Sequence, residues 1–115
     1  MNNPTTLEEC FLYLDEYVGK ENKEYIRGTL NGTHFTIGMN IRNEWGLWNG
    51  GPLRDWFNNI GIYHADDMSG IILTSYQRYL RGEDIGLDER VKHYQQYWVN
   101  LGVNIKAEME ACDGP

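Results

Sequence analysis

The chain has 115 residues, of which 41% are hydrophobic and 13% aromatic, a composition typical of one globular domain and unlike that of a disordered chain. Its formal net charge of −7 opposes direct binding to nucleic-acid phosphates and to anionic membrane surfaces. No apolar run approaches the roughly 18–20 residues needed to cross a bilayer, and we expect one domain over residues 1–115 with an ordered core from about 6 to 110.

The cysteine content and the N-terminal sequence indicate a reducing, cytoplasmic setting. Cys10 and Cys112 are the only cysteines, too few for a disulfide framework and at no spacing typical of zinc ligands. The opening residues do not place basic side chains before a long apolar stretch, as a secretory signal does. We therefore expect no export, no metal and no cofactor.

The first predicted element is a helix over residues 6–19. Thr6 and Glu9 have the spacing of a capping box, and apolar residues then recur every three or four positions. The charged segment 20–28 is predicted to be a second helical turn, because it is short and ends in glycine.

Residues 34–48 fit two structures. The alternation of apolar residues from Phe35 to Ile41 is typical of a strand. Apolar residues from Ile37 to Trp48, however, also share one face of a helix. The length of the segment and the absence of a pairing partner favour the helix, with the strand as the alternative.

Glycine and proline then divide the chain. Residues 49–51 break the segment, and Pro52 is at a favoured first position of the next helix. Asp66 or Asp67 is predicted to cap the helix after it, which ends at Gly82.

The last predicted helix is long and begins with Asp88 as its cap. Its apolar stripe runs from Val91 to Leu101, and Gly102 kinks or ends it before a final apolar segment over residues 105–109. Five or six helices joined by short loops predict an all-α domain.

Arginine and tryptophan cluster in the middle of the chain around a Gly-Gly-Pro turn. On a helix a guanidinium one turn before an indole can stack on it. Arginine beside aromatic faces and loop amides suits a phosphate, nucleotide or carboxylate ligand. The alternative is that the indoles are core residues and the guanidinium groups pair with nearby acids. The candidate ligand-binding residues are Arg42, Trp45, Trp48, Arg54 and His64.

A second cluster could support acid–base catalysis. His64 lies next to the paired carboxylates of Asp66 and Asp67, and these groups together could bind a metal ion or transfer protons. The alternative is structural, because an aspartate pair often begins a helix. No third ligand or nucleophile stands at a supporting spacing, so we assign no catalytic residue and expect a protein that is not an enzyme.

Acidic residues flank the arginine-bearing centre on both sides. Complementary potentials accelerate the encounter of an acidic protein with a basic one, although a charged helix face is often only solvated. The candidate partner-binding residues are Glu8, Glu9, Asp15 and Glu16 in the first helix and Glu83, Asp84, Asp88 and Glu89 around the start of the last.

Four motifs together resemble an uncharacterised family of small bacterial and phage domains. They are residues 42–48 (RNEWGLW), 57–64 (FNNIGIYH), 66–73 (DDMSGIIL) and 94–98 (YQQYW). The resemblance covers about residues 6–98, and Ala65 stands where the family often has proline. It implies a bacterial or phage setting and a helix over the ambiguous segment, and it brings no activity.

These observations predict a small non-catalytic binding protein that occupies a partner protein, as immunity and phage anti-defence proteins do. One alternative is a small-molecule binder that sequesters an anionic, nucleotide-derived signal through the Arg/Trp cluster. The other is a hydrolase-like enzyme that uses His64, Asp66 and Asp67. Helix faces that carry several tyrosines could also form a dimer interface, so a homo-oligomer is a further possibility.

Overall fold

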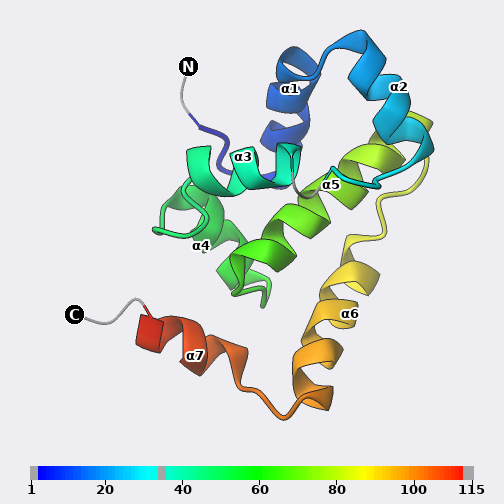
Figure 1. Cartoon of the computed structure of the whole chain (residues 1–115). Coiled ribbons are helices and arrows are strands. Elements are labelled where there is room, and N and C mark those ends of the chain that lie inside the picture. The colour runs from blue at the N-terminus through cyan, green and yellow to red at the C-terminus, as the bar shows by residue number, and fades with distance from the viewer. Residues whose placement is uncertain (1–2, 34–35, 113–115) are drawn as a thin grey trace.

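The computed structural model describes residues 3–33 and 36–112, and within these ranges the regular structure is entirely α-helical. The helices are α1 (Leu7–Tyr17), α2 (Lys20–Gly28), α3 (Ile37–Glu44), α4 (Pro52–Asn59), α5 (Ala65–Arg81), α6 (Leu87–Asn100) and α7 (Ile105–Cys112) (Figure 1). The prediction of an all-α fold is confirmed. The described residues form seven helices and not five or six, because the short segments at 20–28 and 105–112 each close into a helix of their own.

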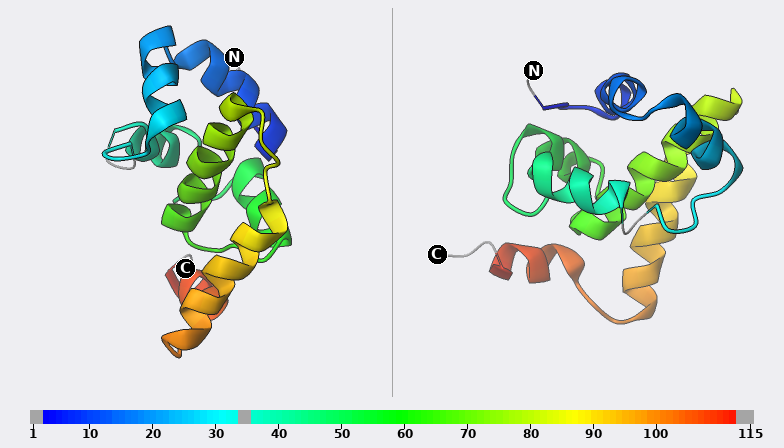
Figure 2. Two further views of the ribbon diagram at one scale, coloured as in Figure 1. Left: turned by 90° about the vertical axis from the view of Figure 1, so that its right-hand side faces the viewer. Right: turned by 45° about the horizontal axis from the view of Figure 1, so that its top comes forward.

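Helix α5 is the centre of the fold. It packs against α1, α2, α3, α4 and α6, and the views of Figures 1 and 2 show it crossing the middle of the molecule. From Met68 to Tyr76 its side chains are buried on nearly every face. A helix that is apolar all round is stable only when neighbours cover it, and the other helices supply that cover.

Local signals set the beginning of α1. The Thr6 hydroxyl accepts the Glu9 N–H at 3.2 Å, as a capping box requires. The Glu9 carboxylate reaches back to the N–H and hydroxyl of Thr5, at 2.9 and 3.0 Å, and not to the N–H of Thr6. One half of the predicted box is therefore present, and the other half is displaced by one residue.

The ambiguous segment is a helix where the structure describes it. Residues 37–44 form α3, whereas positions 34 and 35 of the segment lie outside the described residues. The chain then turns at Gly46, whose φ of +71° favours glycine. Because of this turn Trp45 and Trp48 do not continue the buried face of α3, and the fully buried residue here is Leu47.

Two predicted caps are wrong. The cap of α5 is His64, whose Nδ1 accepts the N–H of Asp66 at 3.0 Å, so Asp66 and Asp67 lie in the first turn. The cap of α6 is Gly86, and Asp88 likewise lies in the first turn. Acidic residues also stabilise the first turn of a helix through the helix dipole. An aspartate at the cap and an aspartate in the first turn therefore give similar sequence signals.

Helices α6 and α7 are less buried than the rest. No residue of α6 is fully buried, and of its predicted stripe Val91, Tyr94 and Trp98 are half-buried whereas Leu101 is exposed. Figures 1 and 2 show α6 running away from the other helices and α7 turning back below α4. None of the helices in the described part of the chain has the length and apolar character needed to span a membrane.

Candidate functional site

The side chain of Arg42 extends from α3 to the N-terminal end of α5. Its Nη1 donates to the Ser69 hydroxyl at 2.7 Å, and its Nε lies 3.4 Å from the Asp66 carboxylate. The guanidinium is largely shielded from solvent. These contacts tie α3 to α5.

His64 lies between two of the tryptophans. Its ring meets Trp48 edge-on at a centroid distance of 5.5 Å and stacks on Trp98 of α6 at 5.8 Å. Because its Nδ1 already accepts a backbone N–H as the cap of α5, this nitrogen is not free to act as a base. The imidazole therefore has a structural role that joins the turn after α3, the start of α5 and α6.

Asp67 is 9% exposed, and its carboxylate accepts the indole N–H of Trp98 at 2.8 Å. Burial raises the pKa of Asp67, and the hydrogen bond from Trp98 opposes that rise. A largely buried carboxyl group with a raised pKa is a feature of some catalytic sites. In this fold the carboxylate connects α5 to α6 through the indole of Trp98.

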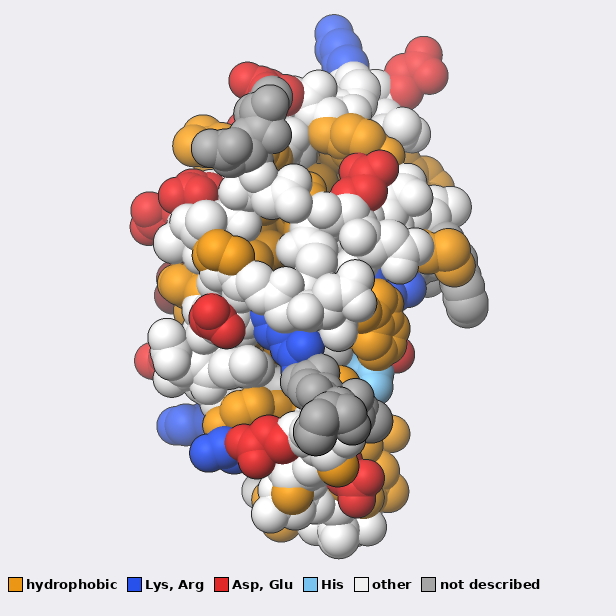
Figure 3. Space-filling model, turned by 90° about the vertical axis from the view of Figure 1, so that its left-hand side faces the viewer, with side chains coloured by type: hydrophobic (Ala, Val, Ile, Leu, Met, Phe, Trp, Pro, Cys, Tyr) orange, Lys and Arg blue, Asp and Glu red, His pale blue; other side chains and the backbone are white. Residues whose placement is uncertain are grey.

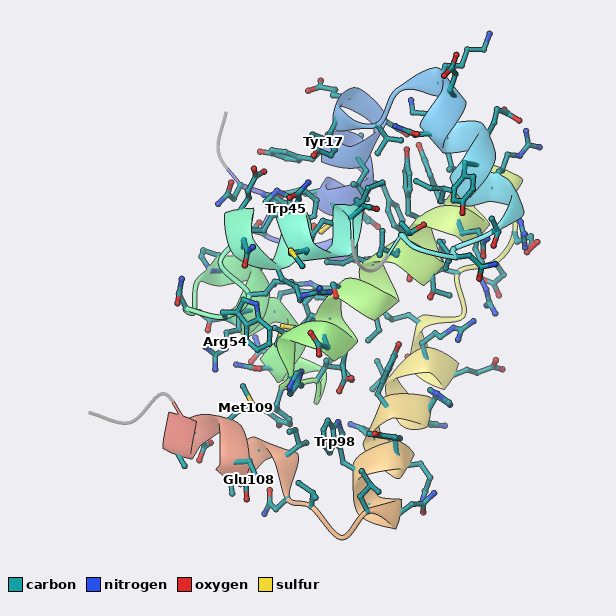
Figure 4. All side chains as sticks on the ribbon, viewed as in Figure 1. Tyr17, Trp45, Arg54, Trp98, Glu108 and Met109 are labelled. Atoms are coloured by element: carbon teal, nitrogen blue, oxygen red, sulfur yellow. The ribbon has the colours of Figure 1, made fainter. Side chains whose placement is uncertain are left out.

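The five predicted ligand-binding residues fall in three surroundings. Arg42, Trp48 and His64 gather at the start of α5. Arg54 on α4 is only 6% exposed, donates to the Trp48 carbonyl at 3.2 Å, and lines a cavity of about 250 Å³ between α4 and α7. Trp45 lies on the other side of α3, and Figure 4 shows it well apart from Arg54.

The predicted partner-binding acids of α1 divide into two pairs. The Glu9 carboxylate is used at the helix start. Asp15 accepts the hydroxyls of Tyr76 and Tyr79, at 2.7 and 3.1 Å, and so bridges α1 to α5. Glu8 and Glu16 are exposed. Neither of these two carboxylates makes an ion pair or hydrogen bond within residues 3–33 and 36–112.

The second acidic group has basic neighbours. Glu83 lies 3.7 Å from the Arg81 guanidinium. The remaining three residues line a hollow of about 390 Å³ that Arg78 also lines: Asp84, Asp88 and Glu89. The negative charge of this group is therefore partly compensated, unlike that of Glu8 and Glu16.

A groove between α1 and α3, with a volume of about 390 Å³, was not anticipated from the sequence as a site. Three aromatic side chains line it: Tyr13 and Tyr17 from α1, and Trp45 from the turn after α3. Figure 4 shows Tyr17 at the end of α1 and Trp45 just after α3. Glu16 from α1 and Glu44 from the end of α3 complete the lining. We call this feature the α1–α3 groove.

The sequence carried a partial signal for this groove. Tyr13 and Tyr17 are four residues apart, so they lie on one face of α1, and Glu44 directly precedes Trp45. What the sequence could not show is that these two short segments come together. On the face drawn in Figure 3, acidic and hydrophobic side chains are scattered among other groups over the upper half.

No group of three His, Cys, Asp or Glu side chains that could hold a metal ion occurs among the residues that the structure describes.

Comparison with known proteins gives one match. The model of a family described as a domain of unknown function (DUF6794) matches residues 3–80, which extend from before α1 almost to the end of α5. No curated protein and no solved structure matches the chain.

Proposed function

The chain belongs to the DUF6794 family of domains of unknown function, and we propose that it is a small non-catalytic binding protein that acts by occupying a basic partner protein. Immunity proteins and phage anti-defence proteins act in this way, and we place the protein among them, in the reducing cytoplasm of a bacterial cell. The buried free thiol of Cys10 is in keeping with that compartment.

The outer face of α1 carries this proposal. Glu8, Leu12 and Glu16 are four residues apart, so they form one stripe along the helix. Leu12 is 63% exposed, and the two carboxylates on either side of it are exposed as well. We call this stripe the α1 face. A large apolar side chain between two uncompensated charges suits a contact whose centre is dry and whose rim is charged.

Charge favours a basic partner. The net charge of −7 attracts a positively charged protein over several ångströms, which raises the association rate and makes it sensitive to salt. The exposed ring of Tyr17 extends the apolar part of this surface toward the α1–α3 groove.

The other two functions receive less support from the geometry. An anionic, nucleotide-derived ligand needs arginines directed into one cavity, whereas Arg42 and Arg54 have different surroundings. An enzyme using His64, Asp66 and Asp67 needs free polar atoms, whereas each of these side chains has a partner in the fold.

The test compares affinity capture by the wild-type protein with capture by Leu12→Lys. Lysine favours helix, so the variant should fold, and its added charge should repel a basic partner. The matched control is Val99→Lys, at a position of α6 that is 67% exposed. We expect a protein enriched from bacterial or phage-infected lysates by the wild type and by the control, released by salt, and lost with Leu12→Lys.

The proposal is refuted by either of two outcomes. One is equal capture by Leu12→Lys and Val99→Lys, because the contact then lies elsewhere. The other is no enriched protein from several host lysates at low ionic strength, where attraction between opposite charges is strongest.

A further inference from the structure

The α1–α3 groove has an apolar floor and aromatic walls. The floor is made by Leu14 and Ile41, which belong to the buried core. Trp45 meets Tyr13 edge-on with the ring centroids 6.3 Å apart, so these two walls support each other. The faces of aromatic rings attract cations that approach within about 6 Å of the ring centre, and tryptophan attracts them best.

Two carboxylates give this groove its charge. Glu16 belongs to α1 and Glu44 to α3, both line the groove, and no basic residue lines it among the described residues. Neither carboxylate makes an ion pair within the described ranges. A cation in the groove would thus meet negative charge from both helices, whereas an anion would be repelled.

Hydrogen bonds hold the walls in position. The side-chain amide of Asn40 donates to the Tyr17 hydroxyl at 3.1 Å, which connects α3 to the exposed wall of α1. The side-chain amide of Asn3 donates to the Glu44 carbonyl at 2.9 Å and holds the segment before α1 against the end of α3. A site whose walls are already in place loses less conformational entropy when a ligand enters.

We infer that the α1–α3 groove binds one cationic side chain, a lysine ammonium or an arginine guanidinium, presented by the basic partner. This inference rests on the proposed function, since it names the chemical group by which that partner is anchored. The volume of about 390 Å³ lies in the range of small-ligand sites. A neutral apolar side chain would desolvate two carboxylates without replacing their hydration, which is unfavourable.

The experiment uses small probes, so it needs no identified partner. Nα-acetyl-lysine methylamide and Nα-acetyl-arginine methylamide supply the cation, and the Nε-acetylated form of the lysine probe supplies the same stem without charge. The binding signal is the indole N–H resonance of Trp45 in ¹H–¹⁵N spectra, assigned by its loss in Trp45→Phe. We expect both charged probes to shift this resonance saturably and the neutral probe to leave it unchanged.

The variant Glu16→Gln/Glu44→Gln should weaken binding of the charged probes by about 2- to 30-fold, as expected for two solvent-exposed ion pairs. Its matched control is Glu21→Gln/Glu108→Gln, which changes the net charge equally at exposed positions outside the groove. The inference is overturned if neither charged probe shifts Trp45 at about 100 mM, the level at which a very weak site fills. Equal binding of the neutral probe, or equal weakening by the control, overturns it as well.

Failure of this inference can be told apart from failure of the proposed function. If Leu12→Lys abolishes partner capture while no probe binds, the partner is real and the groove is not its anchor. If the probes bind but capture is unaffected by Leu12→Lys, the groove is a cation site and the α1 face is not the docking surface.

Discussion

Trp98 is one of the residues that attach α6 to the rest of the fold. Its indole N–H donates to the Asp67 carboxylate at 2.8 Å, and its ring stacks on His64. The variant Trp98→Phe keeps an aromatic ring, removes the N–H donor and makes the ring system smaller. The carboxylate of Asp67, a residue that is 9% exposed, is then left without this partner, which should cost about 1.5–3 kcal/mol of the free energy of unfolding.

The stability that Trp98→Phe loses should depend on pH through the ionisation of Asp67. Burial already raises the pKa of Asp67, and removal of the Trp98 hydrogen bond raises it further. A raised folded-state pKa means that the ionised form is penalised in the native state. The penalty is absent below the ordinary aspartate pKa of about 3.9 and appears as pH rises through the folded-state pKa. The destabilisation by Trp98→Phe should therefore be largest near pH 7 and shrink toward pH 4.

Urea unfolding followed by circular dichroism measures the global effect, and hydrogen exchange of residues 87–100 measures local release of α6. The control is Tyr97→Phe, which removes a hydroxyl from the neighbouring exposed ring of the same helix and should change neither quantity. The reasoning is refuted if Trp98→Phe changes the unfolding free energy by less than about 0.5 kcal/mol and leaves exchange in α6 at the wild-type rate.

Three further predictions concern local features. His64→Ala removes the side-chain cap of α5 and the ring contacts with Trp48 and Trp98. Loss of the cap should cost about 1 kcal/mol in urea unfolding, and this part is what His64→Asp should restore; equal stability of the alanine and aspartate variants would contradict the capping role. Cys10 is buried and its thiol pKa is raised by desolvation, so in a Cys112→Ser background a thiol reagent at pH 8 should label it only when the protein is unfolded; rapid labelling of native protein would show otherwise. Gly82 ends α5 with φ +71°, so Gly82→Ala should cost about 1 kcal/mol, whereas Gly28→Ala, which has neither a positive φ nor a close neighbour, should cost nothing measurable.

The elements that the sequence predicted correctly are those set by neighbouring residues. Thr6 caps α1, Pro52 begins α4 and Gly82 ends α5, and each acts through backbone geometry within one turn. The cap of α5 was assigned wrongly because Asp66 and the actual cap, His64, are two residues apart and both can accept a backbone N–H. Short-range signals thus located the helices but not every terminal residue.

The candidate sites depended on contacts that no local pattern encodes. Asp15 was predicted to contact a partner, yet its carboxylate accepts hydroxyls from residues 61 and 64 positions later. Trp45 and Trp48 were grouped on one helical face, yet the turn at Gly46 directs them to different sides. Spacing indicates which residues share a helix face, but which face meets solvent is decided by the packing of distant helices.

The α1–α3 groove and the cluster around His64 are built from different lengths of the chain. The match to the family ends at residue 80, and every residue that lines the α1–α3 groove lies at or before position 45. The cluster around His64 is instead completed by Trp98 of α6, outside the matched region. The groove should therefore be independent of α6. In Trp98→Phe we expect the lysine probe to shift the Trp45 indole resonance as it does in the wild type, even though α6 is loosened. A weakened response in that variant would show that the groove and α6 are coupled through α5, and the groove could then no longer be treated as a unit built from α1 and α3 alone.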